Sequence, residues 1–218
     1  MKHISITYYS DVLCVWAYIA QVRVDEIAAK FPDQVKIEHR FCSIFGDTAS
    51  KIKTGWHERG GYAGFGEHVL QSVKAFPHVS VHPDIWKTCH PASSAPAHLM
   101  LKAVQQVENS MCKSALNAIR VAFFQDCRDI AQWSVLQDIV EQTGISVKNV
   151  QSFVDSGVAH AALEADIREQ HALMVQGSPS FILNEGRQKL YGNVGYSVIE
   201  ANIKELLRSP DSGSASWC

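Results

Sequence analysis

Apolar and polar positions divide the chain into two strand-like ends and a helical middle. Residues 3–9 are rich in β-branched and aromatic side chains, and residues 34–44 alternate apolar with polar positions, so both are predicted strands. Between them, apolar residues recur at helical spacing from Cys14 to Phe31, and Pro32 follows the expected helix end. A strand, a helix and a strand in this order predict a right-handed unit with parallel strands.

The middle of the chain carries helical patterns without strand alternation. Residues 46–92 are expected to be irregular, apart from a short helix from Glu67 to Ala75. After them, capping serines (Ser93 or Ser94 for the first) and stopping glycines mark a series of helices. The predicted helices span 94–107, 115–124, 134–143, 146–155 and 158–175.

Strand alternation returns near the C-terminal end. Residues 178–186 and 187–193 are predicted strands joined by a tight turn at 184–186, and 195–207 is an amphipathic helix. The order β-α-β, helices, β-β-α predicts an α/β protein whose thioredoxin fold is interrupted by a large all-helical insertion. The expected parts are a thioredoxin-fold domain (1–45 and 166–208), a helical insertion (46–165) and a flexible tail (209–218).

Composition and charge narrow the class of protein. The chain has 218 residues, 46% hydrophobic and 19% charged, which is typical of a globular protein with a sizeable core. A net charge of -2 offers no general attraction to nucleic acid or to anionic membranes. The N-terminus, MKHISITYYSD, lacks the apolar segment of a secretion signal, and no apolar run approaches membrane-spanning length. We therefore expect a cytoplasmic protein with mostly reduced cysteines and no nucleic-acid or membrane partner; a homodimer is compatible with these data.

Three stretches of the chain resemble one family. They are YYSDVLCVWAY (8–18), VAFFQDCRDIAQWSVLQDIVEQTGI (121–145) and VQGSPSFILNEGRQKLYGNVGYSVIEANIKELL (175–207). On these stretches the chain resembles the DsbA family of disulfide oxidoreductases. The resemblance is to its cytoplasmic branch, which is related to FrnE-like dithiol isomerases, kappa-class glutathione transferases and hydroxychromene-carboxylate isomerases.

The first stretch departs from the family pattern at two positions. Cys14 and Trp16 stand where the branch has the first cysteine and the tryptophan of Cys-Pro-Trp-Cys, but Val15 replaces the proline and Ala17 the second cysteine. The resemblance implies redox chemistry at Cys14. The missing second cysteine implies that a thiol from elsewhere completes any reaction.

Cys14 has two interpretations. A cysteine at a helix start becomes a reactive thiolate when the backbone N–H groups and the helix dipole lower its pKa. A cysteine is also a small apolar side chain that is commonly buried in a core. The strand-loop-helix context and the resemblance favour a reactive or ligand-facing thiol, so Cys14 is the predicted catalytic residue.

Pro179 is the second candidate. The resemblance implies a cis peptide bond that packs Pro179 against Cys14 and presents the backbone of Ser178 to glutathione or to an extended peptide. The alternative is a trans proline at the start of an edge strand. Ser180 and Trp16 complete the predicted binding residues, although Trp16 could equally serve only in packing.

The remaining candidates carry weaker signals. Asp11 is expected to cap the first helix. Cys42 follows the second strand at the same sheet edge as Cys14, so it could resolve a disulfide on Cys14 or simply pack in the core. Cys218 would reach Cys14 only if the tail folded back or acted across a dimer. Three further cysteines are expected to be structural: Cys89, Cys112 and Cys127.

Two polar stretches are not expected to bind ligands by themselves. PHVSVHPDIWKTCHP (77–91) matches no standard zinc spacing, so no metal is predicted. RGGYAGFG (59–66) lacks the flanking elements of a phosphate-binding loop and is expected to be a flexible loop that could act as a lid.

Three functions remain open from the sequence. The first is a thiol–disulfide oxidoreductase that uses Cys14, with glutathione as cosubstrate and no permanently bound cofactor. The second is a glutathione-dependent isomerase or transferase in which Cys14 donates a hydrogen bond to a bound thiol. The third is a non-catalytic protein that binds extended peptides or a partner beside Pro179.

Overall fold

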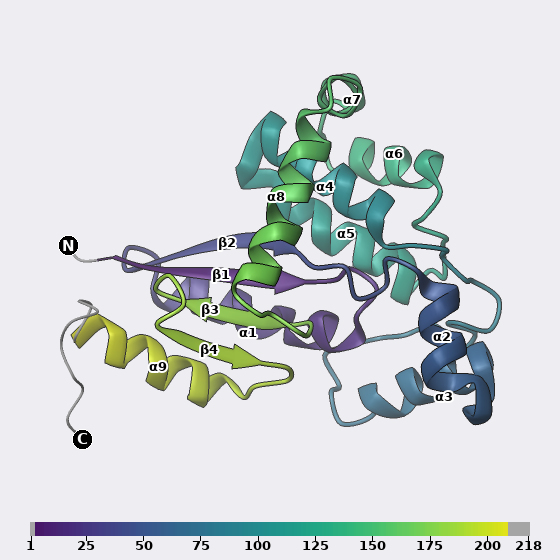
Figure 1. Ribbon diagram of the computed structural model, residues 1–218, viewed down its shortest axis with the longest axis horizontal. Coiled ribbons are helices and arrows are strands. Elements are labelled where there is room, and N and C mark those ends of the chain that lie inside the picture. The colour runs from purple at the N-terminus through teal and green to yellow at the C-terminus, as the bar shows by residue number, and fades with distance from the viewer. Residues whose placement is uncertain (1–2, 209–218) are drawn as a thin grey trace.

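The computed structural model describes residues 3–208 and contains one mixed sheet (Figure 1). Its strands are β1 (Ile4–Ser10), β2 (Val35–Phe41), β3 (Ser180–Leu183) and β4 (Gln188–Tyr191). The strand order is β2-β1-β3-β4, with β1 parallel to β2 and antiparallel to β3, which is itself antiparallel to β4. The predicted α/β class and the thioredoxin-type order of elements are confirmed.

Helices cover both faces of the sheet. On one face, Ile4, Ile6 and Tyr8 alternate along β1 and pack against α1 (Val15–Lys30) and α9 (Tyr196–Arg208). On the other face, α8 (Val158–Ala172) crosses the strands (Figure 1). The period of two along β1 thus separates the two sides of the core, as the sequence pattern predicts.

In the sequence, the inserted helices come between β2 and β3. In space, they lie beside the sheet and beyond one end of it (Figure 1). Their bounds are α2 (Thr48–Trp56), α3 (Gly61–Val73), α4 (Ala95–Glu108), α5 (Cys112–Phe124), α6 (Trp133–Gln142) and α7 (Val147–Asp155). The helices predicted from residue 94 onward are confirmed to within a few residues at their ends. The predicted division between residues 165 and 166 falls inside α8.

Residues 46–73 are mostly helical, so the expectation of an irregular segment with a lid-like loop at 59–66 is wrong. Asp47 caps α2 by accepting a hydrogen bond from the backbone N–H of Ser50 at 3.0 Å. Two glycines of α3 serve close packing: a Cβ on Gly64 would lie 1.8 Å from the carbonyl oxygen of Arg59, and one on Gly66 would lie 2.4 Å from that of Ile85. Glycine is therefore required here by the approach of neighbouring backbone, and it does not mark a flexible loop.

A buried ion pair joins the insertion to the sheet. Lys102 of α4 places its Nζ atom 3.2 and 3.1 Å from the two carboxylate oxygens of Asp166 in α8. The backbone N–H of Phe41, at the end of β2, donates to the same carboxylate at 3.1 Å. Both charged side chains are almost fully buried, so each depends on the other.

We expect Lys102→Met to lower the free energy of unfolding by about 3 kcal/mol, because it removes the nearer cation of the buried Asp166 carboxylate and leaves only Arg40, whose Nε lies 4.0 Å away. The control is Lys113→Met, which breaks the exposed 2.8 Å pair with Asp25 and should cost less than about 1 kcal/mol. Urea unfolding followed by tryptophan fluorescence measures both losses. Equal losses in the two variants would contradict the importance of the buried pair.

Candidate functional site

Cys14 lies where β1 meets α1, at the same edge of the sheet as the start of β3. It occupies the N-cap position of α1, its backbone N–H donates to the carbonyl oxygen of Asp11 at 3.1 Å, and its side chain is buried. The Cys14 thiol donates to the carbonyl oxygen of Ser178 at 3.1 Å. The Ser178–Pro179 peptide bond is cis. The structure therefore brings together three of the predicted site residues from the two ends of the chain.

The surroundings of Cys14 do not favour the thiolate over the thiol. Burial raises its pKa above that of an ordinary thiol, although the Ser178 side chain and the backbone N–H groups of Ala17 and Trp16 lower it in part. The nearby Asp11 carboxylate raises it further. The helix start lowers the Cys14 pKa as expected, but desolvation outweighs these local hydrogen bonds, so the net shift is upward.

We expect the rate of Cys14 alkylation by iodoacetamide to keep rising above about pH 8.5, the pKa of an ordinary thiol, because burial favours the protonated form. Ser178→Ala should move the profile to still higher pH, since the Ser178 side chain stabilises the thiolate. Mass spectrometry of the Cys14 peptide after timed labelling measures the profile, with free glutathione as the reference thiol. A wild-type midpoint below that of the reference would contradict this assignment.

Asp11 organises the backbone around the site. One carboxylate oxygen accepts the N–H of Leu13 at 2.9 Å. The other accepts the N–H groups of Ile44 and Phe45, at 2.9 and 2.8 Å, and the hydroxyl of Ser94 at 2.8 Å. The expectation that Asp11 caps α1 is wrong, because the cap position belongs to Cys14. The carboxylate instead ties the loop before α1 to the loop after β2 and to the start of α4.

His98 of α4 binds the backbone next to Asp11. Its Nε2 atom accepts the backbone N–H of Val12 at 3.1 Å, and its ring stacks on Phe41 with centroids 5.1 Å apart. Burial lowers the pKa of His98, so the ring is neutral and the 3.8 Å approach of Nε2 to Asp11 is not an ion pair.

The sequence did not point to His98, Ser94 or Arg120 as neighbours of the site. Arg120 of α5 is fully buried and donates to Ser10 at the end of β1, at 3.0 Å, and to Gln21 in α1, at 2.7 Å. These residues come from helices of the insertion and have no local signature in the sequence. Only the packing of α4 and α5 against the strand ends brings them to the site.

Cys42 lies close to the same serine as Cys14. The Ser178 side chain lowers the pKa of the Cys42 thiol in part, but burial dominates and raises that pKa well above the ordinary value. The Ser178 hydroxyl also accepts the backbone N–H of Asp11 at 2.9 Å. Cys42 packs with Tyr9 on the sheet face opposite α1, which agrees with the core role, and its resolving role stays a prediction.

The other predicted site residues differ in accessibility. Trp16 is partly exposed and meets Phe76 edge-to-face at 6.3 Å, so it stands at the rim of the site. Ser180 is fully buried and donates its hydroxyl to the carbonyl oxygen of Gly177 at 2.8 Å. Cys218 lies outside the described residues.

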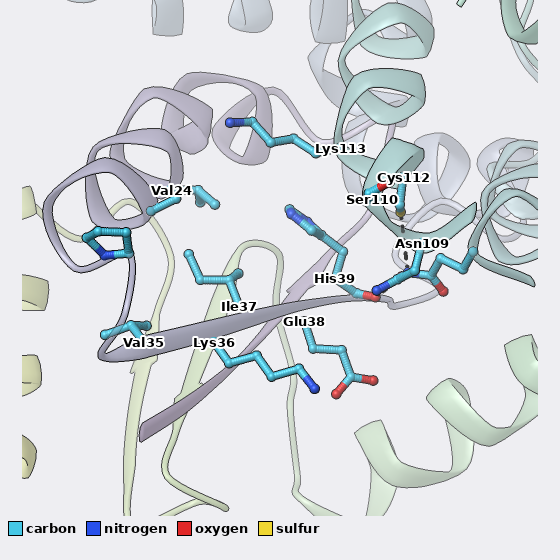
Figure 2. A pocket seen from close by; sticks show the side chains of 13 residues that line it. Val24, Val35, Lys36, Ile37, Glu38, His39, Asn109, Ser110, Cys112 and Lys113 are labelled. Atoms are coloured by element: carbon cyan, nitrogen blue, oxygen red, sulfur yellow. Dashed lines mark hydrogen bonds between the residues drawn. The ribbon is translucent and has the colours of Figure 1, made fainter. Parts of the chain in front are cut away.

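A cavity of about 600 Å³ lies between β2, the C-terminal half of α1 and the start of α5. Figure 2 shows His39 extending from β2 into this cavity, below Lys113. Burial is the main cause that lowers the pKa of His39 to about 4. Cys112, on the wall of the cavity, accepts a hydrogen bond from Gln105 at 3.3 Å. The lining does not include Cys14 or Pro179, so the cavity is separate from the candidate site.

A cysteine at the start of α1 that faces a cis proline at the start of β3 defines a thioredoxin-fold protein. Among thioredoxin-fold proteins, the helices inserted between β2 and β3 place the chain in the subclass with a helical insertion. The chain belongs to the DSBA-like thioredoxin domain family, whose profile matches residues 5–204. Among curated proteins, none matches the chain.

Solved structures share this fold. A protein from Nitrosomonas europaea, provisionally described as a protein disulfide isomerase, matches 96% of this chain with 100% of its own, at 14% identity and a TM-score of 0.77. The match to the cytosolic disulfide reductase DsbM from Pseudomonas aeruginosa covers 92% of this chain and 98% of the DsbM chain, at 18% identity and a TM-score of 0.67. The match to a 2-hydroxychromene-2-carboxylate isomerase covers 97% of this chain and 100% of the isomerase chain, at 15% identity and a TM-score of 0.62. At these identities the likeness shows the fold.

Within residues 3–208, no helix is long and apolar enough to cross a membrane. Over the same residues, no three or more His, Cys, Asp or Glu side chains gather as metal ligands would.

Proposed function

We propose that the protein is a thiol–disulfide oxidoreductase that acts through the single cysteine Cys14, with a small thiol of the glutathione type as the second thiol. The observation that carries the proposal is the position of Cys14 at the start of α1, opposite the cis Ser178–Pro179 bond, with the thiol 3.1 Å from the Ser178 carbonyl oxygen. DsbM, a cytosolic disulfide reductase of the same fold, has also been solved with glutathione, which supports this choice of thiol and a cytoplasmic location.

The Ser178 carbonyl oxygen can change partners when substrate binds. In the structure it accepts the Cys14 S–H group, and it lies just before the cis proline. A glutathione-like or extended peptide backbone that donates an N–H group to this oxygen would release the thiol. Binding beside Pro179 would then free Cys14 for reaction, whether the occupant is a small disulfide or a peptide.

The proposed reaction proceeds in two exchanges. The Cys14 thiolate attacks one sulfur of a disulfide, forms a mixed disulfide and releases the other sulfur as a thiolate, which takes up a proton. A glutathione thiolate then attacks the mixed disulfide, regenerates Cys14 and carries away the second half as a new disulfide. The external thiol supplies the step that Ala17 cannot perform.

The test follows the reduction of hydroxyethyl disulfide by glutathione, coupled to glutathione reductase and NADPH consumption. We expect turnover with the wild-type protein, a mixed disulfide on Cys14 by mass spectrometry, and neither signal with Cys14→Ala. The matched control is Cys112→Ala, which removes a buried cysteine outside the site and should keep both signals. Turnover that survives in Cys14→Ala, or a wild-type protein with neither turnover nor adduct, would refute the proposal.

A second function is favoured by the raised pKa of Cys14. A thiol that stays protonated and donates a hydrogen bond, as Cys14 does to Ser178, is suited to orient the thiolate of bound glutathione. The protein would then be a glutathione-dependent isomerase or transferase, in keeping with the fold of 2-hydroxychromene-2-carboxylate isomerase. A hydroxyl can replace the thiol in this role, so Cys14→Ser should keep glutathione-dependent isomerase or transferase activity. Loss of that activity in Cys14→Ser would exclude this function.

A further inference from the structure

We propose that Cys89 and Cys127 form a second redox site, a reversible disulfide within the inserted helical part. The Cys127 thiol lies 3.7 Å from the side chain of Thr88, the residue next to Cys89, and both cysteines are free in the structure. They come from separate loops, one before α4 and one after α5. The pair is independent of Cys14 and of the function proposed for it.

The two loops are held together by several contacts around the pair. The Cys127 thiol lies 3.7 Å from the hydroxyl of Thr88, the residue next to Cys89, and 3.8 Å from the carbonyl oxygen of Asp84. A backbone hydrogen bond of 2.7 Å, from His82 to Phe124, anchors the same loop to the end of α5. These contacts hold the loop that carries Cys89 beside the loop that carries Cys127.

The two cysteines differ in a way that orders the chemistry. Cys127 is partly exposed, whereas Cys89 is buried, so an oxidant from solution meets Cys127 first. The pKa of the Cys89 thiol is raised to about 12, mainly by burial and next by the neighbouring Cys127. Cys127 is thus the attacking thiol and Cys89 the resolving one.

The oxidant is a small disulfide such as oxidised glutathione. The Cys127 thiolate attacks one of its sulfurs, forms a mixed disulfide and releases one thiolate, which is protonated. The Cys89 sulfur then attacks the sulfur of Cys127, the bond to the small thiol breaks, and the departing thiolate takes the proton that Cys89 loses. One small disulfide is reduced to two thiols, while the cysteine pair is oxidised to one disulfide.

The loop that carries Cys89 runs between two residues that contact the surroundings of Cys14. It follows Phe76, which packs against Trp16, and it leads to Ser94, which donates to Asp11. Between these contacts, the aromatic ring of Trp86 is fully buried. A Cys89–Cys127 disulfide would tie this segment to α5 and restrict its movement.

The test treats the folded full-length protein with oxidised glutathione, blocks free thiols by alkylation and maps the digested peptides by mass spectrometry. We expect a Cys89–Cys127 linked peptide, and a melting temperature raised by roughly 10 °C that returns to its starting value after reduction. Cys89→Ala should instead accumulate a stable mixed disulfide on Cys127. Cys112→Ala, a buried cysteine of the same region, is the matched control and should still form the link.

The outcomes separate this site from the Cys14 function. Recovery of wild-type Cys127 as a lasting glutathione mixed disulfide, or of both cysteines as alkylated thiols, would overturn the pair whatever Cys14 does. Formation of the link in a Cys14→Ala background would support the pair even if Cys14 proved to have no redox role. Peptide mapping of the wild-type protein alone decides the question if a variant fails to fold.

Discussion

Replacing Asp11 by asparagine is expected to lower the free energy of unfolding by about 3–5 kcal/mol. The change keeps the shape of the side chain and removes its negative charge. In the folded protein the Asp11 carboxylate is fully buried and accepts four hydrogen bonds: one from its own loop, two from the loop after β2 and one from Ser94 at the start of α4. No other residue of the candidate site connects so many separate segments.

The loss of stability in Asp11→Asn arises because the NH₂ group of the asparagine would face hydrogen-bond donors that now face a carboxylate oxygen. One oxygen of Asp11 accepts the N–H groups of Ile44 and Phe45 and the Ser94 hydroxyl. An asparagine can offer an oxygen to one side of the group only, so its NH₂ group would oppose either these donors or the N–H of Leu13. Buried donors left without an acceptor lose their hydrogen bonds to water as well, which makes the loss large.

Two controls isolate the effect of the buried carboxylate. Asp47→Asn makes the same chemical change at the exposed cap of α2 and should cost less than about 1 kcal/mol. Ser94→Ala removes one of the four donors and should cost about 1 kcal/mol. Urea unfolding monitored by circular dichroism gives all three values, and a loss in Asp11→Asn no greater than in Asp47→Asn would show that the network does not hold the site together.

The strands and the helices after residue 94 could be predicted from local patterns, such as the β-branched and aromatic residues of 3–9 and the helix start at Cys14. The meeting of Cys14 with Pro179 was implied by the family resemblance. The order of elements then places these strand ends at one edge of the sheet. The site geometry follows from the topology, because β1 and β3 are neighbours in the sheet.

The role of Asp11 and the state of the thiol could not be predicted in this way. Asp11 looked like a helix cap because its partners Ile44, Phe45 and Ser94 are distant in the sequence and carry no motif. The helix-start argument for Cys14 considered only stabilising backbone groups, whereas its pKa is set mainly by burial among residues from both ends of the chain and the insertion. Gly64 and Gly66 misled for a similar reason, since close backbone contact and flexibility produce the same glycine-rich composition.

Replacing Cys14 by serine is expected to reduce disulfide exchange by about a thousandfold or more, because a serine hydroxyl cannot form the mixed disulfide. The substitution keeps a small hydrogen-bond donor at the N-cap of α1, where the Cys14 thiol donates to the Ser178 carbonyl oxygen. It therefore separates covalent chemistry at Cys14 from the hydrogen bond that the same residue makes.

The measurement compares two activities in the same preparation. Glutathione-dependent reduction of hydroxyethyl disulfide reports on covalent exchange, and addition of glutathione to 1-chloro-2,4-dinitrobenzene reports on an oriented glutathione thiolate. Cys14→Ala serves beside Cys14→Ser because it lacks the donor as well as the nucleophile. Matching melting temperatures of the two variants would show that both retain the fold.

The pattern of losses assigns the role of Cys14. If exchange is lost in both variants, the thiol acts as the nucleophile, and a glutathione-type thiol completes the cycle in place of the residue at position 17. If the transferase activity persists in Cys14→Ser and disappears in Cys14→Ala, the hydrogen bond is the functional feature, as the raised pKa of the buried thiol allows. Unchanged disulfide exchange in Cys14→Ser would contradict a nucleophilic role for Cys14, because no oxygen nucleophile sustains thiol–disulfide exchange at that rate.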